Sequence, residues 1–157
     1  MKIKIILLAG LLVGSLDIIA ACVDYYIATG NGPAGVLRYI ASGVFGDQAF
    51  TGSSAMIVWG LSFHYVIAYS FTILFFWLYP RIKFMATNPV ATAVLYGISM
   101  WIITALIIVP LSSTPPLPFV FWKAVKAVLI LIFMISLPLA FIAKRTADGK
   151  SPTNTRN

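Results

Sequence analysis

Four long apolar stretches constrain the fold of this chain more than any other feature. They cover residues 5–28, 54–79, 89–110 and 119–143. A helix of about 20 apolar residues crosses the hydrocarbon core of a bilayer. In lipid the backbone must form its hydrogen bonds internally, and a continuous helix does so. The strands of a membrane barrel are instead short and alternate between apolar and polar residues, which these stretches do not. The stretches therefore predict an all-α fold, an integral membrane four-helix bundle.

The composition leaves little room for anything outside this bundle. Hydrophobic residues make up 61% of the 157 residues and charged residues only 10%, whereas charged residues approach a quarter of a soluble domain. We expect one transmembrane domain over residues 1–145 and a polar, disordered cytoplasmic tail over residues 146–157.

The segment between the first two stretches, residues 33–46, has a helical pattern of its own. Its apolar residues recur on one face of a helix: Val36, Leu37, Ile40, Val44 and Phe45. This pattern predicts a short interfacial helix on the outer membrane surface. A re-entrant segment that lines a cavity is the alternative.

The positive charge of the chain, +7, lies mainly on one side of the predicted spans. Eight of the eleven basic residues flank that side: Lys2, Lys4, Arg81, Lys83, Lys144, Arg145, Lys150 and Arg156. Lys and Arg accumulate on the cytoplasmic side of membrane proteins, which predicts that both termini are cytoplasmic. This placement accounts for the charge without a nucleic-acid partner, and the bilayer is the expected partner.

Asp17 and His64 lie in the middle of the first and second spans, at similar depth. A charged side chain near the bilayer midplane must face protein or water. We expect the two residues to form an intramembrane polar pair. Such a pair could relay protons or bind a cation, because histidine titrates near neutral pH; alternatively, it fixes only the register of two packed helices.

Small residues share a face with these polar ones. Gly10, Gly14, Asp17, Ala21 and Asp24 fall within an arc of about 80° on the first span, and Gly60 begins a similar stripe that includes His64. Glycines at this spacing let helices approach closely. We expect Gly10, Gly14 and Gly60 to serve helix packing, within the chain or in a homodimer.

Asp24 and Lys126 form a second candidate pair, near the outer ends of the first and fourth spans. Lys126 lies about two turns inside the fourth span, where an ammonium group needs a partner or water. We expect an outer-side ion pair between them.

Known catalytic and metal-binding patterns are missing from the sequence. One histidine and one cysteine cannot supply a zinc site of the usual spacing, so we expect no enzyme activity, no metal and no cofactor. Residues 19–22 (Ile-Ala-Ala-Cys) resemble a lipoprotein cleavage box that would lipidate Cys22. Apolar sequence continues beyond Cys22, which favours an uncleaved helix.

With these residues in view, the chain resembles a family of small bacterial inner-membrane proteins with four spans. The resemblance covers nearly the whole chain and rests on residues 9–17, 37–43, 61–64, 88–90, 96–97, 109–112 and 137–138. Members of that family carry glycine at the position of Ser136 and a histidine in the fourth span that has no counterpart here. The resemblance implies a multi-pass protein of the bacterial inner membrane and assigns no chemistry to its motifs.

The sequence thus favours a non-enzymatic structural or accessory membrane protein with a buried polar core. It could work as a homo-oligomer or with a membrane-protein partner. The alternative is a small oligomeric channel or proton-coupled transporter that uses Asp17 and His64.

Overall fold

The computed structural model describes residues 3–116 and 118–148, and within them every regular element is a helix. Four helical segments are long and apolar enough to cross a membrane, which confirms the predicted fold class. The first two are α1 (Ile3–Thr29) and α4 (Ala55–Leu78). The third comprises α6 (Pro89–Ile103), η1 (Thr104–Ile108) and α7 (Val109–Leu111), and the fourth comprises α8 (Phe121–Ile130), η2 (Leu131–Ser136) and α9 (Leu137–Asp148).

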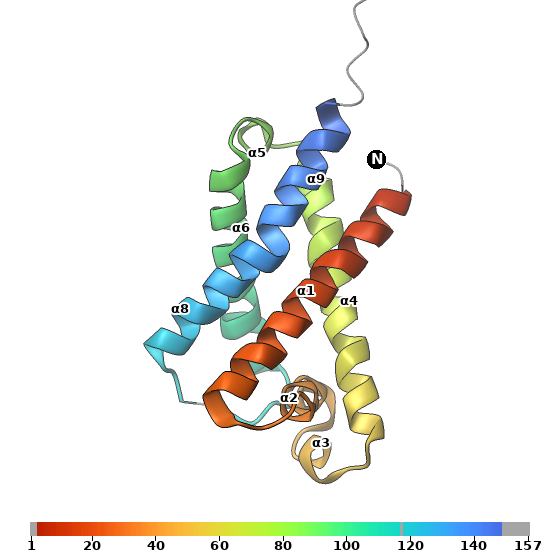
Figure 1. Cartoon of the computed structure of the whole chain (residues 1–157), viewed down its shortest axis with the longest axis vertical. Coiled ribbons are helices and arrows are strands. Elements are labelled where there is room, and N and C mark those ends of the chain that lie inside the picture. The colour runs from red at the N-terminus through yellow and green to blue at the C-terminus, as the bar shows by residue number, and fades with distance from the viewer. Residues whose placement is uncertain (1–2, 117, 149–157) are drawn as a thin grey trace, which may run out of the picture.

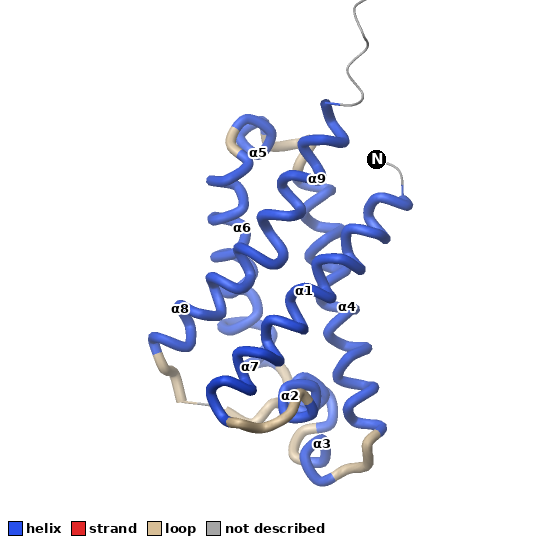
Figure 2. Tube along the Cα trace, in the orientation of Figure 1, coloured by secondary structure: helices blue, strands red, loops and turns tan. Residues whose placement is uncertain are grey.

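Three short helices lie at the ends of the bundle (Figure 1). The predicted helix after the first span is α2 (Ala34–Phe45), and it is followed by α3 (Gln48–Thr51) at the same end, here called the α2 end. Helix α5 (Lys83–Thr87) lies at the opposite end, the α5 end, where α1 begins and α9 finishes. Figure 2 shows that the loops gather at these two ends.

Helix α2 runs across the spans and is seen end-on in Figure 1. It packs on α4, where a Cβ on Gly60 would lie only 1.9 Å from the carbonyl oxygen of Leu37. On another side the backbone N–H of Ser113 donates to the carbonyl of Gly43, at 3.0 Å. Helix α2 is therefore held between α4 and the connector that follows α7.

Among the described residues, the buried hydrophobic core lies mainly in the half of the bundle toward the α5 end. It is centred on Phe75, which is fully buried and meets the ring of Tyr96 edge-on at 4.9 Å. The other members of this core are Ala9, Val13, Phe71, Phe76, Tyr79, Met85, Ala93, Met100, Ile135, Leu139, Ala140 and Ala143.

The third and fourth spans each contain a π-helical segment, and each segment ends two residues before a proline, Pro110 or Pro138. Proline has no N–H to donate, and its ring collides with the carbonyl four residues earlier. A wider turn before the proline accommodates that carbonyl. The π-helical segment of the fourth span lies close to α6: a Cβ on Gly97 would lie 3.1 Å from the Cα of Ile132.

The observed bounds differ from the expected ones at the C-terminal end. Helix α9 continues to Asp148, so residues 146–148 of the expected disordered tail are helical. The hydroxyl of Thr146 donates to the carbonyl of Ile142 at 2.7 Å, and Arg145 in the last turn complements the helix dipole. Residues 149–157 of that tail lie outside the described residues.

Candidate functional site

His64 is buried on α4 and bonds to the backbone of α1. Its Nε2 lies 2.8 Å from the carbonyl oxygen of Gly14, and because a carbonyl only accepts, Nε2 donates. The approach depends on Gly14 having no side chain, since a Cβ there would lie 3.0 Å from the ring of Tyr65. The polar stripe of α4 therefore reaches α1 through a main-chain acceptor.

Asp17 lies one turn further along α1. At about 100° per residue it projects within roughly 60° of Gly10, Val13 and Gly14, all three of which are buried. Asp17 thus faces the bundle, one turn along α1 from the Gly14 carbonyl to which His64 bonds. Among the described residues its carboxylate accepts no hydrogen bond and forms no ion pair. The structure brings the two residues near each other, and the direct bond of His64 is to Gly14.

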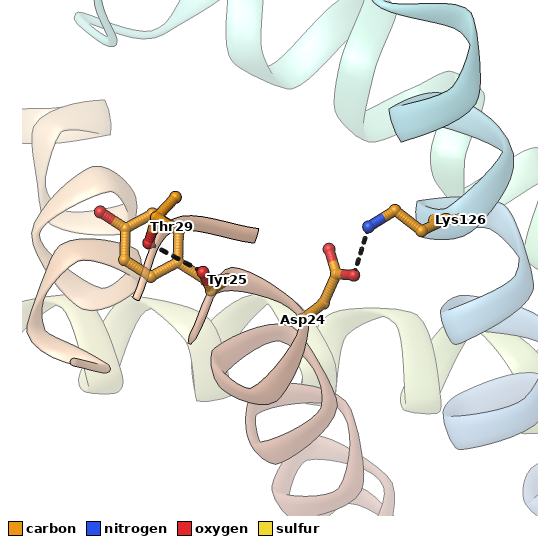
Figure 3. A network of polar contacts seen from close by, with 4 residues as sticks. All are labelled: Asp24, Tyr25, Thr29 and Lys126. Carbon is orange, nitrogen blue, oxygen red and sulfur yellow. Dashed lines mark hydrogen bonds and ion pairs between the residues drawn. The ribbon is translucent and has the colours of Figure 1, made fainter. Parts of the chain in front are cut away.

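Asp24 and Lys126, the other candidate pair, are in direct contact at the α2 end (Figure 3). Nζ of Lys126 lies 2.5 Å from Oδ1 of Asp24 and joins α8 to α1. The two side chains remain 36% and 38% exposed, so protein covers this pair only partly. Figure 3 also shows Thr29, whose hydroxyl donates to the carbonyl of Tyr25 in the last turn of α1.

The three packing glycines contact different partners. Gly10 lies under the ring of Tyr69, where a Cβ would come within 2.4 Å of the ring carbons. Gly14 lies against Tyr65 and Ala68, whereas Gly60 faces α2 and not α1. The glycine face of α1 is therefore occupied by α4 of the same chain.

Tyrosine hydroxyls of α4 supply contacts to α1 that the sequence analysis did not anticipate. Tyr69 donates to the carbonyl of Leu7 at 3.0 Å, and Tyr65 shares a 2.8 Å hydrogen bond with Ser15. Their spacing of four residues, one position after His64 and Ala68, places them beside the polar stripe of α4. That spacing could have predicted that both tyrosines lie close to α1.

Arg38 also has a role that the sequence analysis missed. Its Nη1 donates to the carbonyls of Ala49, Phe50 and Gly52, at 2.8, 3.3 and 2.9 Å. The last carbonyls of a helix lack partners within that helix, and Arg38 supplies one for the end of α3. Beside it, burial raises the pKa of the Tyr39 phenol above its ordinary value.

In the described part of the chain, no three His, Cys, Asp or Glu side chains gather as metal ligands would. Cys22 is a free thiol on α1. It lines an apolar groove of about 460 Å³ on the outside of α1, α2 and α4, together with Ile18, Ile19, Val23, Tyr26, Pro33, Leu37 and Leu61.

Four apolar helical segments of 23 to 28 residues define the class of this chain as a multi-pass membrane protein. No family model, curated protein or solved structure matches it. The resemblance to bacterial four-span proteins therefore stays a prediction.

Proposed function

We propose that this chain is a non-enzymatic accessory protein of the bacterial inner membrane, with a polar interior that holds its spans in register. One observation carries the proposal: polar side chains bond to backbone carbonyls of neighbouring spans. In the interior, His64 bonds to Gly14 and the hydroxyl of Tyr96 donates to the carbonyl of Phe71 at 2.6 Å. At the surface of the bundle, Tyr69 donates to Leu7. Such bonds stabilise helix association in lipid and are typical of a scaffold.

The charge distribution supports an orientation with both termini in the cytoplasm. The described basic residues of the α5 end are all exposed: Lys4, Arg81, Lys83, Lys144 and Arg145. At the α2 end, Arg38 and Lys126 are bound to carbonyls and to Asp24, which leaves Lys123 free of such contacts among the described residues. The excess of solvent-facing cations at the α5 end favours the cytoplasm for that end.

Native mass spectrometry of the protein purified from its own membranes in mild detergent tests the accessory role. A foreign membrane subunit in a fixed ratio is the expected result. The variant Tyr69→Phe, which lacks the hydrogen bond to Leu7, is purified in parallel. It reports whether this bond between α4 and α1 is needed for binding of the foreign subunit. A homo-oligomer without any foreign subunit contradicts the proposal.

A second candidate function, a small proton-coupled channel or transporter, is favoured by the position of Asp17. An intramembrane acid that faces the bundle without a hydrogen-bond partner is typical of proton pathways. In proteoliposomes under an imposed pH gradient, Asp17→Asn should abolish proton flux while the protein stays folded. Asp47→Asn, at the start of α3 and outside the four spans, is the control for loss of a carboxylate. Flux equal to that of the wild type in Asp17→Asn excludes this candidate.

A further inference from the structure

The bundle is packed unequally along its length. Toward the α5 end all four spans contribute buried side chains. Toward the α2 end, α1 has no buried residue after Ile18, and η1, α7 and α8 have none at all. The buried residues of that half lie instead around α2 and α4, among them Ala41, Ser42 and His64. The side of the bundle between α1 and α8 is therefore the loosely packed one.

Ionisable side chains line that loosely packed side. Asp17 and Asp24 are seven residues apart on α1, so they share one face and lie about 10 Å apart along the axis. Lys126 reaches the same face from α8 and binds Asp24 (Figure 3). Ala21 lies between the two acids and is itself only half-buried. Charged groups therefore follow one another from the α2 end to the middle of α1.

Ionisable groups at membrane depth face either protein partners or water. Asp24 and Lys126 have each other, yet each stays more than a third exposed. Asp17 has no hydrogen-bond partner in the described residues, and the hydrophobic core stops short of it. Within the described part of the chain no other side chain completes their contacts, so water at this face is the partner that fits all three.

We propose that water enters the bundle from the α2 end between α1 and α8, and that Asp17 and His64 form a proton-binding site that exchanges with that side of the membrane. The charged and titratable groups that face the path are Asp17 and Asp24 from α1 and Lys126 from α8, with His64 of α4 at its inner end. The Tyr65 phenol of α4 bonds to Ser15 on the other side of α1. The core of the other half closes the path toward the α5 end. The inference concerns access of water and protons, and it holds whether or not the chain transports a substrate.

Cysteine accessibility tests the path, because a thiol reacts with a methanethiosulfonate only as the thiolate, which needs water. Cys22 is the one cysteine of the chain, so Cys22→Ser gives a background without thiols. Single cysteines are then placed by Ala21→Cys and Asp24→Cys on the proposed path, and by Asp17→Cys at its end. The reagent is a charged, membrane-impermeant methanethiosulfonate, applied separately to each side of oriented vesicles.

Ile19→Cys is the matched control, since Ile19 lies at nearly the depth of Asp17 on the opposite face of α1 and is 60% exposed toward lipid. The native Cys22, which lines the apolar outer groove, is a second control in the unmodified chain. We expect the Ala21 and Asp24 positions to react at least tenfold faster than both controls, from the α2 side alone. Asp17→Cys should react from the same side, more slowly.

Equal rates at Ala21→Cys and Ile19→Cys would overturn the proposal, as would reaction from the α5 side. Ala21→Cys adds only a sulfur atom at a half-buried position, so the test does not depend on whether Asp17→Cys folds. The result is also independent of the partner experiment, because it measures water at named positions and not the composition of a complex.

Discussion

Replacing Gly60 by alanine should separate α2 from α4. An ideal Cβ at this position lies 1.9 Å from the carbonyl oxygen of Leu37 and 2.7 Å from its carbonyl carbon. To restore a carbon–oxygen contact of about 3.3 Å, the helices must move apart by roughly 1.4 Å. The obstacle is backbone, which cannot rotate away as a side chain would. Overpacking of this kind costs about 1–3 kcal/mol.

Gly43→Ala is the matched control for this substitution. It lies in α2, and a Cβ there would meet Thr114 Oγ1 at 3.6 Å, an ordinary contact. Alanine is favoured over glycine within a helix by up to about 1 kcal/mol, so this variant should be as stable as the wild type or more so.

Reversible unfolding in mixed micelles of detergent and dodecyl sulfate measures the free energy of both variants. We expect Gly60→Ala to be less stable than Gly43→Ala by about 1–3 kcal/mol, the cost of overpacking, because the gain in helix propensity is common to both substitutions. Equal stability of the two variants would show that α2 does not pack on α4 through Gly60.

Three further experiments test contacts that hold the bundle together. Arg38→Ala leaves three carbonyls at the end of α3 without their donor and should cost about 2 kcal/mol in the same unfolding assay; stability equal to that of the wild type would mean that water replaces the guanidinium without loss. Tyr96→Phe removes a buried hydroxyl bond and should cost about 1 kcal/mol, more than Tyr69→Phe, whose bond is exposed. Exchanging the charges by Asp24→Lys with Lys126→Asp should recover stability that each single reversal loses. A double-mutant cycle should give a coupling of roughly 0.5–1 kcal/mol, because the pair is partly exposed, and zero coupling would contradict the contact.

The sequence predicts the spans of this protein well because length and hydropathy alone determine them. The four expected stretches agree with the observed segments to within a few residues, except where α9 continues to Asp148. Helix α2 was also predictable, since its apolar residues repeat at helical spacing. These features follow from whether each segment is apolar enough to lie in lipid, amphipathic enough to lie at the membrane surface, or polar enough to lie in water.

Which side chain meets which could not be predicted in the same way. The stripe of Gly60 and His64 suggested one partner for both, yet Gly60 faces α2 and His64 faces α1. A stripe of small and polar residues identifies a packing face of a helix. Two helices that cross at an angle stay in contact over a limited length only, so different parts of one face can contact different helices. Arg38 was missed for a related reason: its acceptors are main-chain carbonyls of α3, and carbonyls have no signature in a sequence.

Helix α4 explains why the bundle is tight at one end and loose at the other. Toward the α2 end, α4 is engaged by α2 through Gly60 and by α1 through His64. Toward the α5 end it carries Phe71, Phe75 and Phe76, which are large enough to reach the third and fourth spans. The fourth span packs on α4 through α9, whereas its α8 segment lies against α6 and is joined to α1 by Lys126 and Asp24. Because α8 has no buried side chain and its ion pair with α1 is partly exposed, α8 can part from α1 without disturbing the aromatic core, which is the property that a water path to Asp17 requires.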